Sequence, residues 1–175
     1  FEGANNVVIG KLAGQDLTAA DGNVIIGEDA GKGQTTADNN VLIGQGAGEA
    51  ITTGGDNIFI GQAAGDGHDA ETNNLGIGKN SLGGSVNGGE FNVAIGNNTL
   101  DALTSADNNV AVGYGAGGAI NIGGNNVIVG KDAALTAGGA VNSVFIGHDV
   151  AKAMSAGDIP GNVIIGAGAV NTGAF

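Results

Sequence analysis

The segments Asn92-Val-Ala-Ile-Gly96 and Asn109-Val-Ala-Val-Gly113 are two copies of the pattern that decides the fold. The pattern returns along the whole chain of 175 residues, and successive copies are 17 residues apart except for intervals of 18 before Gly96 and 19 before Gly166. The closing glycines of the ten copies are Gly10, Gly27, Gly44, Gly61, Gly78, Gly96, Gly113, Gly130, Gly147 and Gly166. No boundary interrupts the copies, so we expect residues 1-175 to form one repeat domain, a fragment of a longer fibrous protein.

Each copy indicates a short strand that is apolar on both faces. Ile or Val precedes every glycine, and Val, Ile or Leu stands two residues earlier, as Ile95 and Val93 do. Residues two apart on a strand share a face, and we expect this pair to point inward. The residue between them is then predicted to point outward, into an oligomer interface, because soluble monomers rarely expose a long apolar row. The predicted interface residues are Val8, Ile25, Leu42, Phe59, Ala94, Ala111, Ile128, Phe145 and Ile164.

Asparagine stands four residues before the closing glycine in nine copies, and Ser143 takes its place in the tenth. A short amide can bond to nearby backbone and stack on the same amide of the next coil, which predicts a structural role. These residues are Asn6, Asn23, Asn40, Asn57, Asn74, Asn92, Asn109, Asn126 and Asn162. The glycine ends the strand, where a residue without Cβ can take a positive φ or allow close packing of the next turn.

Together these positions predict an all-β fold, a parallel β-solenoid of ten coils of about 17 residues that stack on one another. A helix of hexapeptide repeats, as in acyltransferases, needs aliphatic residues every six positions. The sixth position after the glycine instead holds residues such as Asp16, Gly33 and Ala50. The hexapeptide fold is therefore excluded.

Composition excludes several classes of protein. The 37 glycines have no three-residue period and there is one proline, which excludes collagen. A net charge of −12 would repel phosphates and anionic lipid, so we expect no nucleic-acid partner. The sequence has no run of 18 apolar residues, so we expect no membrane insertion of this fragment. Because cysteine is absent, the chain has no disulfide framework and no thiolate metal site.

The sequence carries no pattern of catalytic residues. The two histidines, His68 and His148, lie at different positions of the repeat, and no serine has a plausible histidine partner, so we expect no enzyme activity and no transition-metal site. Acidic turn residues such as Asp66, Asp69 and Glu71 suit calcium, but neither the calcium-binding nonapeptide nor the EF-hand loop is present. We expect no cofactor. The alternative hypothesis is a calcium-stabilised monomeric solenoid module of a secreted or surface-layer protein.

The two segments quoted first, each followed by a small residue three positions after the glycine, resemble the head repeats of trimeric autotransporter adhesins and similar repeats of bacteriophage tail fibres. The stretch 97-104, Asn-Asn-Thr-Leu-Asp-Ala-Leu-Thr, also looks like a fibre repeat. The resemblance covers all ten copies, although adhesin head repeats are typically shorter than these. It implies a left-handed parallel β-roll, a homotrimer, and an extracellular location on a virion tail fibre or a bacterial cell surface.

The resulting hypothesis is a non-catalytic structural and adhesive rod of a surface fibre, which contributes to host or surface attachment through a cell-surface receptor or glycan. Insertions in repeat proteins map to loops on one face, which makes the two breaks in the period candidates for receptor contact. The candidates there are Ser85, Asn87, Glu90 and Asp158, and Tyr114 is an aromatic candidate near a turn.

Overall fold

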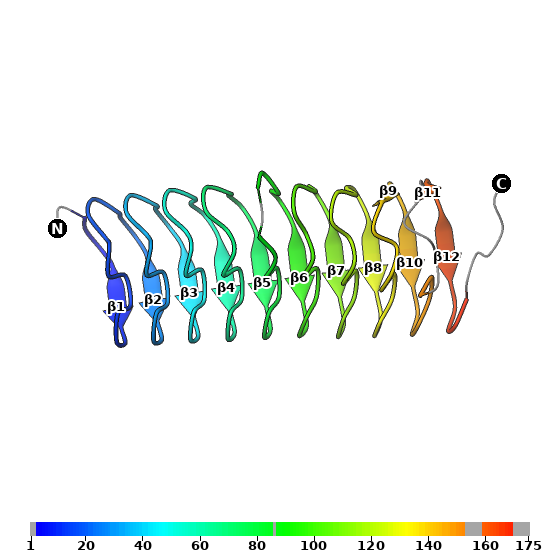
Figure 1. Cartoon of the computed structure of the whole chain (residues 1–175), viewed down its shortest axis with the longest axis horizontal. Helices are drawn as coiled ribbons and strands as arrows, with labels where there is room; N and C mark the ends of the chain where they lie inside the picture. Colours follow the sequence, from blue (N-terminus) through cyan, green and yellow to red (C-terminus); the bar gives the residue numbers. More distant parts are fainter. Residues whose placement is uncertain (1–2, 86, 153–158, 170–175) are drawn as a thin grey trace.

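The computed structural model of the chain is a row of stacked coils (Figure 1), and it describes residues 3–85, 87–152 and 159–169. One strand from each coil joins a single parallel sheet, in the order β1-β2-β3-β4-β5-β6-β7-β8-β10-β12. The strands of this sheet are β1 (Val7–Ile9), β2 (Val24–Ile26), β3 (Val41–Ile43), β4 (Ile58–Ile60), β5 (Leu75–Ile77), β6 (Val93–Ile95), β7 (Val110–Val112), β8 (Val127–Val129), β10 (Val144–Ile146) and β12 (Val163–Ile165). The predicted β-solenoid is confirmed.

The register of the sheet follows the sequence repeat. Each strand pairs with the next so that equivalent positions are neighbours, as Ile25 and Leu42 are. The two longer intervals keep this register, since Leu75 still pairs with Val93. A small second sheet, β9 (Ala140–Val141) paired with β11 (Ile159–Pro160), lies beside the later coils. The extra residues are thus accommodated between the strands of the main sheet.

The prediction of which strand residues face outward was wrong. The middle residues of the strands, expected to point outward, face the interior and are fully buried within one chain: Ile25, Leu42, Phe59, Ala94, Ala111, Ile128 and Phe145. Ile164 is partly buried against the same core, and Val8 is exposed on the terminal strand β1. The flanking Val and Ile residues, expected inside, lie on the outer face. The middle residues therefore form the core and cannot be an oligomer interface.

The narrow interior of the coil explains this inversion. The buried asparagine and the middle residue are two positions apart, so an inward asparagine requires an inward middle residue. The interior is also tightly packed between coils. Phe59 lies beside Gly76, where a Cβ would be 3.0 Å from the Phe59 ring, so the Phe59 side chain occupies the space that a side chain at position 76 would need.

The asparagines form a buried ladder along the solenoid. The Oδ1 of Asn23 accepts the backbone N–H of Asn40 at 2.8 Å, and Asn92 and Asn109 repeat this contact at 3.0 Å. The Nδ2 of Asn40 donates to the carbonyl of Gly54 at 2.8 Å, across the inside of the coil. Each amide therefore joins neighbouring coils and also closes its own coil.

The closing glycines from Gly10 to Gly147 are required by both backbone conformation and space. Gly27 has a φ of 138°, and a Cβ there would lie 2.4 Å from the carbonyl oxygen of Gly44 in the next coil. This φ lies in a region that residues with a Cβ rarely adopt. The atom that a Cβ would meet belongs to the backbone of Gly44, so no side-chain rotation could relieve the clash. Glycine at this position thus permits the close stacking of successive coils.

Candidate functional site

The outer face of the main sheet is a continuous aliphatic surface. It consists of the two flanking residues of each strand, and we call it the aliphatic face: Val7, Ile9, Val24, Ile26, Val41, Ile43, Ile58, Ile60, Leu75, Ile77, Val93, Ile95, Val110, Val112, Val127, Val129, Val144, Ile146, Val163 and Ile165. Even at mid-rod, Ile95 and Val110 keep 37% of their surface exposed. With strands about 4.8 Å apart, this face is roughly 45 Å long.

The two apolar faces of the strand were predicted from the sequence, but each was placed on the wrong side of the coil. The signal that would have corrected it was the uniform size of the flanking residues, which are always Val, Ile or Leu, against a middle position that ranges from Gly76 to Phe59. Variable volumes are typical of a closed interior, where neighbours must compensate. The aliphatic face, and not the middle residues, is the candidate interface.

Several acidic side chains in the turns accept hydrogen bonds from backbone and hydroxyl groups of nearby turns. The Asp38 carboxylate accepts the N–H of Asp21 at 2.7 Å. The Glu71 carboxylate accepts the N–H groups of Asp69 and Gly88, each at 2.8 Å. Within residues 3–85, 87–152 and 159–169, no group of three or more His, Cys, Asp or Glu side chains is placed to hold a metal ion.

The first break in the period places two polar side chains on the surface. Ser85 and Asn87 are exposed, and the backbone N–H of Asn87 donates to the carbonyl of Thr104 at 2.6 Å, which attaches the loop to the next coil. Glu90 is half-buried, and its carboxylate accepts a hydrogen bond from the hydroxyl of Thr72 at 3.3 Å. Asp158, the candidate in the second break, lies outside the described residues.

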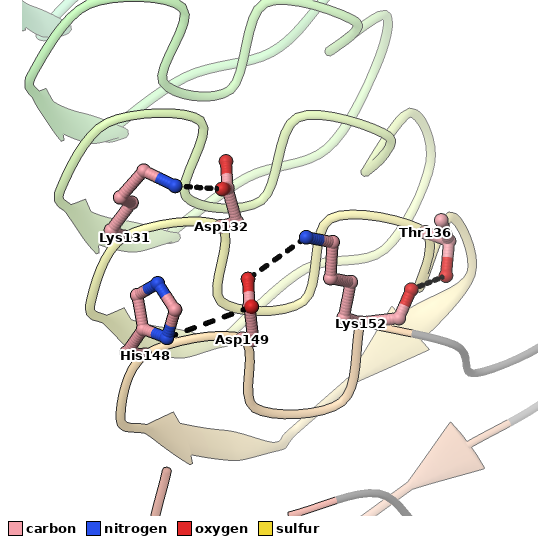
Figure 2. A network of polar contacts seen from close by, with 6 residues as sticks. All are labelled: Lys131, Asp132, Thr136, His148, Asp149 and Lys152. Atoms are coloured by element: carbon pink, nitrogen blue, oxygen red, sulfur yellow. Dashed lines mark hydrogen bonds and ion pairs between the residues drawn. The ribbon is translucent and has the colours of Figure 1, made fainter. Parts of the chain in front are cut away.

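A network of charged side chains follows β8 and β10 (Figure 2). Lys131 bonds to Asp132 at 2.6 Å, and on the next coil Asp149 accepts Lys152 at 3.0 Å and lies 3.6 Å from His148. Hydrogen bonding from Lys152 holds the pKa of Asp149 below its usual value. Each of these two carboxylates therefore has a lysine partner within its own turn.

Two polar residues interrupt the apolar interior opposite the strands. Gln34 and His68 are fully buried at the position that holds Ile51 in the coil between them. The His68 ring packs edge-on against Phe59, with centroids 4.8 Å apart, and neither ring nitrogen has a hydrogen-bond partner among the described residues. Burial disfavours the charged imidazolium and lowers the pKa of His68 to about 4, although Glu71 opposes this effect.

The buried imidazole predicts acid sensitivity. Because the folded pKa of His68 lies near 4 and the unfolded value near 6.5, the unfolded chain binds more protons in this window. The free energy of unfolding is therefore not reduced by His68 above pH 6.5. It falls as the pH drops toward 4, by up to about 3 kcal/mol, because the imidazole must stay neutral in the folded chain. In urea titrations at several pH values, His68→Leu should flatten this loss. Gln34→Leu, a change at the same buried repeat position that removes no titrating group, should keep the pH dependence of the parent chain. Equal pH profiles for parent and His68→Leu would contradict the prediction.

Tyr114 lies at the start of the loop after β7 and keeps 52% of its surface exposed. The ammonium of Lys131 is 6.0 Å from the centre of its ring. A hollow of about 390 Å³ opens beside it, with Asp101 and Asp132 among its walls. Sequence reasoning singled out Tyr114 but missed the hollow, because its walls come from three successive coils.

Comparison with models of known protein families, with curated proteins and with solved structures gives no match for this chain. In the described part of the chain, no helix has the length and apolar character needed to cross a membrane.

Proposed function

We propose that this chain is a non-catalytic structural and adhesive rod of an extracellular surface fibre, on a phage tail or a bacterial cell, and that it works as a homotrimer. The observation that carries the proposal is the aliphatic face, which runs along the main sheet from β1 to β12. Soluble monomers rarely expose one contiguous apolar surface along a whole sheet. Another copy of the same rod offers a matching face of equal length.

The energetics favour association along this face. Each of ten strands contributes two flanking residues, twenty in all. Away from the ends of the rod, about a third of each side chain or less is exposed, and burying that part gains roughly 0.5–1 kcal/mol per residue. The gross gain of roughly 10–20 kcal/mol for each copy is comparable with the roughly 4–15 kcal/mol that association costs. The proposal of three chains, rather than another number, is based on the resemblance of the repeats to those of trimeric adhesin heads.

A trimeric rod suits attachment. Backbone hydrogen bonds and the amide ladder join every coil to the next, so the rod is stiff and holds surface groups at fixed spacing. Three parallel copies would present each group three times and raise avidity without new contacts.

Sedimentation equilibrium with and without a calcium chelator tests the assembly. We expect a mass of three times 16.7 kDa that does not change with the chelator. The double variant Val110→Lys/Val127→Lys should sediment as a monomer, because it places charges on the aliphatic face.

The matched control is Ala102→Lys/Ser105→Lys, which adds the same charge at exposed positions outside the aliphatic face and should remain trimeric. A monomeric parent chain would contradict the proposal. A monomer that folds only with calcium would establish the alternative, a calcium-stabilised solenoid module.

A further inference from the structure

The surface of the rod has a hollow where one coil carries glycine at two positions that bear side chains in the neighbouring coils. Gly115 and Gly118 stand two and five residues after the closing glycine Gly113, and every other copy carries a side chain in at least one of these positions. The neighbouring coils keep their side chains there, among them Asp101 and Asp132. The hollow of about 390 Å³ is the space left between them, and we call it the notch.

Gly115 and Gly118 form the base of the notch, and the carboxylates of Asp101 and Asp132 lie close to them. A Cβ on Gly115 would lie 2.7 Å from Asp132 Oδ1, and one on Gly118 would lie 3.3 Å from Asp101 Oδ1. Any side chain at these positions would therefore fill the space that the two carboxylates now face. The volume lies at the lower end of the roughly 300–1,000 Å³ of small-molecule sites.

The walls combine acceptors with apolar surface. Asp132 is bound by Lys131 at 2.6 Å, whereas Asp101 has no ion pair among the described residues, and burial raises its pKa. The half-exposed ring of Tyr114 and the side chain of Leu135 line the same hollow. Such a site offers carboxylate oxygens that only accept hydrogen bonds, next to an aromatic surface that favours a flat apolar face.

We infer that the notch binds a single ring of a neutral saccharide, with its C–H face on Tyr114 and its hydroxyl groups donating to Asp101 and Asp132. The inference rests on the proposed adhesive function and specifies the chemistry of its ligand. Hydrogen bonds to ionised carboxylates are the stronger kind, and adjacent hydroxyls can use both oxygens of one carboxylate. Two carboxylates against one lysine, in a chain of net charge −12, disfavour an anionic sugar.

Saturation-transfer NMR with defined sugars tests the inference. The probes are the methyl glycosides of glucose, galactose and mannose, together with anionic N-acetylneuraminic acid. We expect at least one neutral glycoside to bind with a Kd on the order of 1 mM, as suits a ligand of this size, and N-acetylneuraminic acid to give no signal. Tyr114→Ala, Asp101→Asn and Gly118→Gln should each weaken binding about ten-fold or more. Gly118→Gln fills the notch with a residue that the same repeat position carries at Gln15.

Two variants at equivalent positions three coils away serve as controls. Gln62→Ala matches Tyr114→Ala, and Glu49→Gln matches Asp101→Asn, and both should bind like the parent chain. The inference is overturned if no neutral glycoside binds, if N-acetylneuraminic acid binds equally well, or if the three notch variants bind like the parent.

The mass of every sample, measured by sedimentation, separates this inference from the proposed rod. A trimer whose notch takes no sugar overturns the saccharide inference and leaves the rod standing. A monomer that binds a neutral glycoside in the notch overturns the trimer and supports the saccharide inference.

Discussion

Gly44→Ala should destabilise the protein by more than about 4 kcal/mol, the range reached when a substitution forces the backbone apart. The φ of Gly44 is 136°, and a Cβ there would lie 2.4 Å from the carbonyl oxygen and 2.6 Å from the carbonyl carbon of Gly61. No side-chain rotation relieves a clash between Cβ and backbone. Guanidinium titration followed by far-UV circular dichroism, at one protein concentration, measures the loss.

Gly44→Ala should also divide the rod into two parts that unfold separately. Stability in solenoids is approximately a sum over neighbouring repeats, so separating the coils of β3 and β4 should replace one cooperative transition by two. Gly88→Ala is the matched control, because Gly88 also has a positive φ of 97° but a Cβ there would meet no atom of the described residues within 4 Å. Gly88→Ala should lower the free energy of unfolding by only about 1–2 kcal/mol, the cost of holding an alanine at a positive φ. Similar losses for both variants would show that stacking distance does not set the requirement for glycine.

Asn109→Ala should cost about 2–6 kcal/mol, because it leaves two or more buried groups without partners at roughly 1–3 kcal/mol each. The Asn109 Oδ1 accepts the backbone N–H of Asn126 at 3.1 Å, and its Nδ2 donates to the carbonyl of Gly123 at 3.0 Å. Alanine can replace neither contact. The free energy of unfolding, again at fixed protein concentration, is the measurement.

Asn109→Ser is the natural control, since the chain itself carries serine at this position of the ladder. The Ser143 hydroxyl accepts the N–H of Asn162 at 3.2 Å and donates to the carbonyl of Val141 at 3.0 Å. Serine at 109 should therefore retain part of the stability that alanine loses. If alanine and serine were equally tolerated, the ladder would not be a main source of the stacking energy.

The candidate site was only partly accessible from the sequence. Tyr114 stood out because it is the single tyrosine in a chain with few aromatic residues. Asp101 and Gly118 did not stand out, since each belongs to a position where polar and small residues vary freely. Their proximity depends on stacking, which brings residues 17 apart into contact, and on the absence of two side chains in one coil.

The sequence by itself determined the period, the coil and the register, because a repeated motif stacked on itself can pair only with its own equivalent positions, as Ile25 does with Leu42. Only the tertiary structure decided which face of the strand is inside. A strand of three apolar residues has no polar side to distinguish its faces, so alternation alone gives two equal answers. Closure of the coil around the asparagine ladder buries the middle residue and leaves the aliphatic face outside, since side chains two positions apart must share one interior.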